Sequence, residues 1–121
     1  MSTWKTPQRI WLTGATSGIG EALAQQLIAQ GHQVVLSARN ADTLNALCDG
    51  HANAYPLPLD ISDRQAVLAA GEQIRKWLGA LDVALFNAHL AAMRERGLLA
   101  MFGHVAAVEQ PGGFVDGLDA A

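Results

Sequence analysis

The segment TGATSGIG, residues 13–20, places three glycines between the first apolar stretch of the chain and the first amphipathic one. The preceding stretch, 9–13, is short and apolar like a buried strand. The following stretch, 18–30, carries apolar residues at helical spacing and stops before Gly31. So short a glycine-rich turn sets the amino end of a helix beside the end of a strand. The chain is therefore constrained to begin as a βα unit.

Strands are predicted to recur along the chain after this unit. We expect them at 33–38, 54–59 and 81–87, where apolar residues run together as they do in strands buried on both faces. Pro56 and Pro58 each lack a backbone donor, so the strand that contains them should lie at a sheet edge or be irregular.

Helices are predicted between these strands. One should begin after the cap Asn40 and end near Cys48. The next should be capped by Ser62 or Asp63 and end near Leu78, before Gly79. Its apolar side is expected to comprise Val67, Leu68, Ile74 and Trp77.

The order βαβαβαβ predicts an α/β fold: a Rossmann-like doubly wound parallel sheet, incomplete at about four strands and followed by an irregular C-terminal tail. Residues 91–102 are expected to form a helix weakened by Gly97. Residues 105–108 should form either a short strand or no regular structure, and 110–121 a frayed tail.

Composition excludes several classes of protein. Half of the 121 residues are apolar and the net charge is −3, without a basic stripe, so we expect no nucleic-acid partner. The single cysteine, Cys48, excludes an internal disulfide, and the four scattered histidines predict no metal site. Neither a signal peptide nor a membrane-spanning run is recognisable, so we expect a cytoplasmic protein with no membrane partner.

The position of the glycine-rich turn, between a strand and a helix, suggests how it would bind an anion. Gly14 suits a sharp bend, Gly18 lets the backbone approach a phosphate, and Gly20 lets the helix pack closely on the strand. Free amides and the positive end of the helix dipole would then face an anion. The alternative is an ordinary turn, in which the Ser17 hydroxyl makes a local bond instead of binding phosphate.

The spacing G-x-x-x-G-x-G in TGATSGIG resembles the cofactor motif of the short-chain dehydrogenases/reductases. Three further motifs fit the same family in its order: Ser37-Ala38-Arg39, Asp60-Ile61 and Asn87-Ala88. The resemblance implies that the pyrophosphate and adenosine half of NAD(H) or NADP(H) bind this half of the chain. It assigns the dinucleotide to the residues Gly14, Thr16, Ser17, Gly18, Ile19, Gly20, Arg39, Asp60, Ile61, Asn87 and Ala88.

Within that resemblance, the Asp60 carboxylate is expected to accept a bond from the adenine amino group, and Asn87 to steady the sheet beneath the cofactor. At the end of the second strand an acid binds the 2′-hydroxyl of NAD(H), whereas an arginine pairs with the 2′-phosphate of NADP(H). This chain has Arg39 there and no acid, which favours NADP(H) over NAD(H). The alternative is that Arg39 is only a solvated neighbour of the helix cap.

No residue of this chain is predicted to be catalytic. The family's proton donor is a tyrosine in a Tyr-x-x-x-Lys pair with an upstream serine. Here the one tyrosine, Tyr55, is followed by Pro-Leu-Pro-Leu, the only lysines are Lys5 and Lys76, and no serine follows Ser62. The composition also changes at His89, where the family has glycine. We therefore expect a dinucleotide-binding half-domain over 1–88 and a divergent segment over 89–121, helical at first and then disordered.

Two interpretations remain open. The first is an NADP(H)-dependent oxidoreductase acting on a carbonyl or alcohol, whose chain is truncated or frameshifted. The alternative is a non-catalytic nucleotide-binding fragment without enzymatic activity. A sheet of four strands would leave an apolar edge uncovered, so we also expect a homo-oligomer or self-association through that edge.

Overall fold

The structure is a computed structural model, and it describes residues 6–16, 18–87 and 106–110. Strands and helices alternate along the first two of these ranges, and a further strand occupies the third. The elements are β1 (Arg9–Thr13), α1 (Gly18–Ala29), β2 (Gln33–Ser37), α2 (Ala41–Cys48), β3 (Ala54–Pro56), α3 (Arg64–Leu78), β4 (Val83–Asn87) and β5 (Ala106–Gln110).

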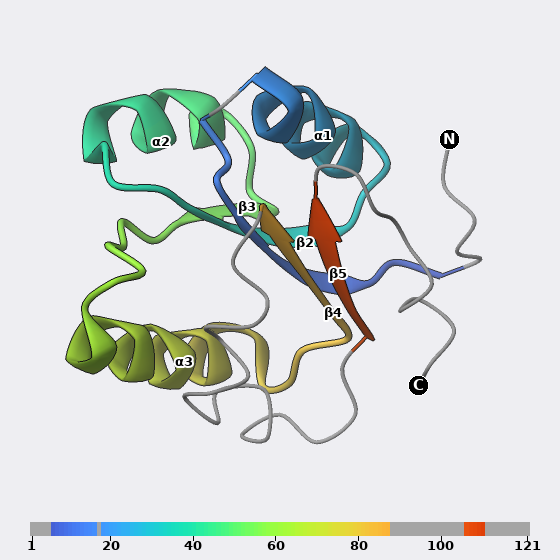
Figure 1. Cartoon of the computed structure of the whole chain (residues 1–121). Helices are drawn as coiled ribbons and strands as arrows, with labels where there is room; N and C mark the ends of the chain where they lie inside the picture. The colour runs from blue at the N-terminus through green and yellow to red at the C-terminus, as the bar shows by residue number, and fades with distance from the viewer. Residues whose placement is uncertain (1–5, 17, 88–105, 111–121) are drawn as a thin grey trace.

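The strands form one parallel sheet in the order β3-β2-β1-β4-β5. Helices α1 and α2 lie on one face and α3 on the other (Figure 1). The chain moves outward from β1 through β2 to β3 and then crosses back to β4, so the strand order reverses between β1 and β4. The predicted α/β, Rossmann-like fold is confirmed, and such sheets bind ligands at the carboxyl ends of their strands.

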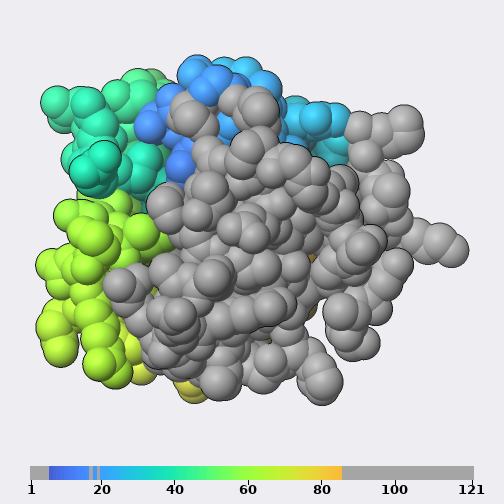
Figure 2. Space-filling model, in the orientation of Figure 1, coloured from blue at the N-terminus to red at the C-terminus, as the bar shows by residue number. Residues whose placement is uncertain are grey.

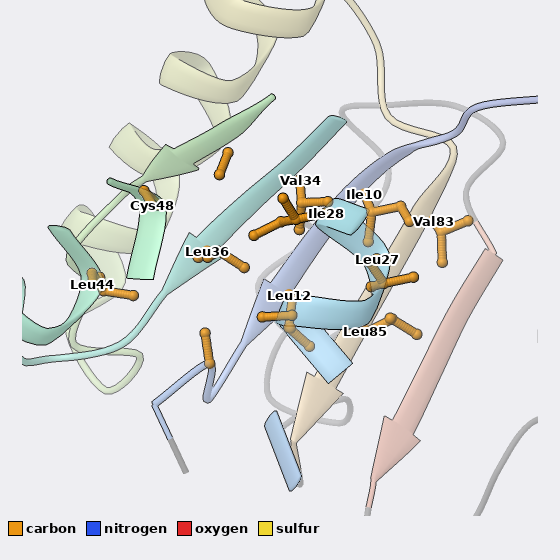
Figure 3. Close-up of a cluster of buried hydrophobic side chains, with 13 residues drawn as sticks. Ile10, Leu12, Leu27, Ile28, Val34, Leu36, Leu44, Cys48, Val83 and Leu85 are labelled. Atoms are coloured by element: carbon orange, nitrogen blue, oxygen red, sulfur yellow. The ribbon is translucent and has the colours of Figure 1, made fainter. Parts of the chain in front are cut away.

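Alternation along the strands divides the core into two layers. Ile10 and Leu12 of β1 face α1 and α2, whereas Trp11 between them faces α3, and all three are almost completely buried. In Figure 3, side chains of α1 such as Leu27 and Ile28 project toward the strands beneath them. Both faces of β1 are thus covered, which explains why its three middle residues are all apolar.

The capping residues that the sequence predicts are found at the ends of the helices. The Asn40 side chain accepts from the backbone N–H of Thr43 at 3.0 Å, and Asp63, one of the two predicted alternatives, caps α3 by accepting from Ala66 N–H at 3.2 Å. Gly31 lies two residues past the end of α1, and its φ of 90° lets the His32 N–H reach the Leu27 carbonyl.

Strand β3 lies at an edge of the sheet, as its prolines predict, although it is shorter than expected. The N–H groups of Leu57 and Leu59 continue the pairing with β2, donating to Leu36 and Ala38 at 2.9 Å. Because alternate residues of a strand direct their N–H groups to opposite sides, the prolines at 56 and 58 occupy positions facing away from β2. Their missing donors therefore cost no sheet hydrogen bond.

Trp77, which was assigned to the apolar side of α3, lies at the edge of that side. It is 38% exposed and packs against Tyr55, with ring centroids 5.4 Å apart. Trp77 follows the buried Ile74 by three residues and falls at the border of the buried face.

The C-terminal predictions are tested only in part. The stretch left open between a strand and no regular structure is strand β5, which pairs with β4 from Val83↔Ala106 to Asn87↔Gln110. The helix expected at 91–102 and the tail at 111–121 lie outside the described residues. None of the helices that the structure describes is long and apolar enough to cross a membrane.

Candidate functional site

A pocket of about 260 Å³ opens at the carboxyl ends of β1, β2 and β3. It is built where the three strands run into the β1–α1 turn, the β2–α2 connection and the segment after β3. Its lining residues are Thr13, Gly14, Ser37, Arg39, Leu59, Asp60, Ile61 and Ser62. In Figure 1 this end of the sheet is where β1 turns upward into α1.

The β1–α1 turn depends on the conformation of Gly14. Its φ of 70° lies in the left-handed region that glycine adopts without strain, as the sequence predicts for a sharp bend. The next N–H, that of Ala15, donates to the Ser37 carbonyl at 3.2 Å and ties the turn to β2. The Ala15 N–H therefore already has an acceptor, and an anion at the turn would be held by the N–H groups of later residues.

The backbone at the start of α1 is open to approach. Gly18 is the first helical residue, and a Cβ built on it would meet no other heavy atom within 4 Å. This open space fits the expectation that a phosphate comes close to Gly18. Gly20 is buried, Thr16 is half-buried, and neither Ser17 nor the side chain of Ile19 is among the described parts of the chain.

A buried hydrogen bond holds Ser37, one of the residues that line the pocket. Trp11 Nε1 donates to Ser37 Oγ at 2.9 Å, and both residues are buried, at 0% and 1% exposed. This bond links the middle of β1 to the end of β2 and satisfies the polar edge of a large buried ring. The pocket is thus supported by a rigid sheet rather than by loops alone.

The two charged residues predicted for the cofactor lie in this one pocket. Arg39 and Asp60 both line it. The pKa of Asp60 is lowered mainly by hydrogen bonds from the Ser62 hydroxyl and N–H, which approach Asp60 Oδ1 to 2.7 and 3.0 Å. The positive charge of Arg39 adds a smaller effect in the same direction. Asp60 is therefore an ionised, acceptor-only carboxylate at neutral pH.

The structure brings some predicted residues together and separates others. Gly14, Arg39, Asp60 and Ile61 share the pocket, whereas Asn87 ends β4 on the other side of β1, and Ala88 is outside the described residues. The sequence analysis missed four lining residues, which are Thr13, Ser37, Leu59 and Ser62. Each lies within two residues of a predicted site residue, and this closeness in sequence could have identified them.

Tyr55 is not among the residues of the pocket. Its ring packs on Trp77, and it contributes to the layer between the sheet and α3. A second pocket, of about 310 Å³, lies between α1 and α2 and is lined by Gln25, Ile28, Ala29, Ala46, Leu47 and His51. It contains neither an arginine nor a glycine turn. Among the described residues, no group of three acidic, histidine or cysteine side chains is arranged to hold a metal ion.

The first pocket fits an anionic nucleotide. Its lining combines the Gly14 bend, a guanidinium after β2 and an ionised carboxylate after β3. The open backbone of Gly18 begins the next helix. These groups suit phosphate oxygens on one side and the donor edge of a base on the other. A parallel doubly wound sheet with this site defines the class of Rossmann-like dinucleotide-binding domains.

The family is shown by comparison with known proteins. Residues 8–104 match the model of the short chain dehydrogenase family, so the chain belongs to that family of oxidoreductases. A nicotinamide dinucleotide is the cofactor that this membership implies. The match extends past His89, where the composition changes.

Individual relatives agree with the family. The chain is 41% identical over 83 residues to a probable NADP-dependent dehydrogenase of Dichelobacter nodosus, covering 68% of this chain and 78% of that protein. It is 40% identical over 87 residues to a fatty acyl-CoA reductase of Mycobacterium tuberculosis, covering 69% of this chain but only 30% of that one.

The fold also matches a solved structure. A short-chain dehydrogenase from Streptomyces avermitilis superposes with a TM-score of 0.69 at 24% identity, covering 84% of this chain and 48% of that one. The chain therefore spans less than half the length of that structure and of the fatty acyl-CoA reductase, although it spans most of the Dichelobacter relative.

Proposed function

We propose that this chain binds NADP(H) in preference to NAD(H), with the pyrophosphate at the β1–α1 turn and the adenosine half in the pocket between that turn and Ser62. The residues proposed for the contact are Gly14, Thr16, Ser17, Gly18, Ile19, Gly20, Arg39, Asp60, Ile61, Asn87 and Ala88. The volume of about 260 Å³ suits one end of a dinucleotide rather than the whole molecule.

One observation carries the choice of cofactor: Arg39 lines the same pocket as Gly14 and Asp60. The residues that end β2 and follow it, Ser37 and Ala38, supply no carboxylate to bind a 2′-hydroxyl or to repel a 2′-phosphate. A guanidinium at that place pairs with a phosphate in a charge-assisted, often bidentate contact. The printed name of the Dichelobacter relative, an NADP-dependent dehydrogenase, supports the same choice.

Two activities are compatible with this binding. Family membership supports hydride transfer between NADP(H) and a carbonyl or alcohol. The alternative is binding without catalysis, which the inventory of residues favours, because these 121 residues contain no Tyr-x-x-x-Lys sequence and the ring of Tyr55 packs on Trp77. A reduced dinucleotide without a proton donor beside the substrate would be a poor reductant of carbonyls.

Calorimetric titration of the purified chain with NADPH and NADH tests the proposal. We expect NADPH to bind at least ten times more tightly, and equal affinities would refute the cofactor assignment. An NADPH oxidation assay with a panel of aldehydes and ketones then separates the two activities. Turnover would identify an enzyme, and binding without turnover would identify a non-catalytic fragment.

The segment after His89 has its own proposal. Its lack of serine, threonine, lysine, asparagine and isoleucine motivates the hypothesis of a frameshift in the gene. Sequencing the DNA tests it, because the family's catalytic half should then appear downstream in another reading frame. The domain boundary at residue 88 remains a prediction, since the family match continues to residue 104.

Self-association also remains a prediction. The β3 edge suits it poorly, since Pro56 and Pro58 occupy the positions whose N–H groups would face outward. The other edge strand of the described sheet is β5. Sedimentation at several concentrations would detect a dimer, and a single monomeric species throughout would refute the expectation.

A further inference from the structure

Ser62 makes two contacts with the carboxylate proposed to bind adenine. Its hydroxyl donates to Asp60 Oδ1 at 2.7 Å, and its backbone N–H donates to the same oxygen at 3.0 Å. Both residues line the pocket. One carboxylate oxygen is thus held twice by the protein, and acceptor sites on the carboxylate remain for a ligand.

These contacts matter because Asp60 is exposed. An exposed aspartate without partners samples several rotamers, and ordering it when a ligand binds costs entropy. The two bonds from Ser62 order the Asp60 side chain before a ligand binds, so that less entropy is lost on binding. They also lower the pKa of Asp60, whose carboxylate is an acceptor only at neutral pH.

Helix capping does not account for Ser62. The cap of α3 is Asp63, whose side chain accepts from Ala66 N–H, and the preceding turn is closed by the Asp63 N–H donating to the Asp60 carbonyl at 3.0 Å. Neither bond uses the Ser62 hydroxyl. Its recorded hydrogen bond is to Asp60, within the pocket.

We propose that Ser62 is a positioning residue for base recognition: it holds the Asp60 carboxylate in one orientation toward the pocket and so sets the preference for a base with an amino group. The inference rests on the proposed function. An adenine offers a 6-amino donor to the carboxylate, whereas hypoxanthine offers a 6-oxo acceptor that the carboxylate repels.

The test compares NADPH with its hypoxanthine analogue, in which a 6-oxo group replaces the 6-amino donor and N1 carries a hydrogen. We expect the wild-type chain to prefer NADPH, and Ser62→Ala to reduce that preference about three- to tenfold, the value of one neutral hydrogen bond. Ser62→Thr keeps a hydroxyl and should retain the preference. Asp63→Ala weakens the cap of the same helix and serves as the control for a purely structural effect, because it leaves both bonds to Asp60.

Each outcome has a distinct meaning. An unchanged base preference in Ser62→Ala, or an equal change in Asp63→Ala, overturns the inference. A wild-type chain that binds NADPH and the analogue equally also overturns it, while the proposed function stands. A wild-type chain that binds neither ligand refutes the proposed function and the inference with it. An NMR titration of the ligand-free chain gives an independent readout, since Ser62→Ala should raise the pKa of Asp60.

Discussion

Trp11 Nε1 donates a buried hydrogen bond to Ser37 Oγ, and this contact joins the central strand to the end of β2 at a residue that lines the pocket. Ser37→Ala deletes that acceptor and should lower the free energy of unfolding by about 1–3 kcal/mol, the cost of a buried donor that loses its partner. Urea unfolding measures the effect. In a double-mutant cycle, Trp11→Phe and Ser37→Ala should be strongly non-additive, and additive losses would show that the contact contributes nothing.

Arg39→Ala should weaken NADPH binding about 10- to 100-fold and NADH binding far less, because only NADPH carries the 2′-phosphate. Lys76→Ala is the matched control. It removes the same charge from an exposed position near the end of α3, away from the residues of the pocket. Equal losses of NADPH and NADH affinity in Arg39→Ala would contradict the assignment, as would a loss of the same size in Lys76→Ala.

Gly14→Ala forces a Cβ into a φ of 70° and should destabilise the fold by about 1–2 kcal/mol while also weakening the dinucleotide complex. Gly31→Ala introduces comparable strain at φ 90° beyond α1, where the new Cβ meets no atom within 4 Å. It should cost similar stability without changing affinity at temperatures where both variants are folded. Thermal unfolding and calorimetry measure the two effects, and similar affinity losses would show that the turn acts only through stability.

His32 should make stability depend on pH. Burial lowers its pKa, and Nδ1 accepts from the Gln8 backbone N–H at 2.9 Å, a bond that the protonated ring cannot make. Because the folded pKa lies below the unfolded value of about 6.5, stability is complete above that pH and is lost as the pH falls through the folded pKa. Urea unfolding at pH 7.5 and 5.0 should therefore show a smaller pH difference in His32→Asn than in the wild type.

His51→Asn is the control for that experiment, since His51 is exposed. It should leave the pH difference unchanged. Asp82 does not confuse the comparison: the hydrogen bonds from Arg9 lower the pKa of its carboxyl from 3.8, so its contribution to stability is lost only at more acidic pH. If the free energy of unfolding of His32→Asn changes between pH 7.5 and 5.0 as much as that of the wild type, His32 is not the source of the pH dependence.

The elements of the fold that local chemistry controls were predictable from the sequence. Asn40 and Asp63 cap helices because their short polar side chains reach free N–H groups, and Gly31 ends α1 because it tolerates a positive φ. The partial exposure of Trp77 was not predicted, because helical periodicity cannot show how far the buried face of a helix extends. Strand β5 includes the polar pair Glu109 and Gln110, which no apolar pattern identifies.

The candidate site was predictable where sequence motifs mark it, but its side-chain hydrogen bonds were not. Motif positions located Gly14, Arg39 and Asp60 on one pocket because the carboxyl ends of parallel strands meet there. Ser62 was recognised only as a potential cap, because the choice between capping a helix and bonding a carboxylate two residues away depends on three-dimensional geometry. The contact of Trp11 with Ser37 likewise requires the register between β1 and β2.

The most direct test of the account is an NMR titration of the ¹⁵N-labelled chain with NADPH, which reports which backbone amides sense the ligand. We predict the largest shifts at residues 14–20, at Arg39 and across Asp60 to Ser62. Shifts centred instead on the pocket between α1 and α2, around Gln25 and His51, or no shifts at millimolar NADPH, would contradict the central claim that the β1–α1 turn holds a dinucleotide.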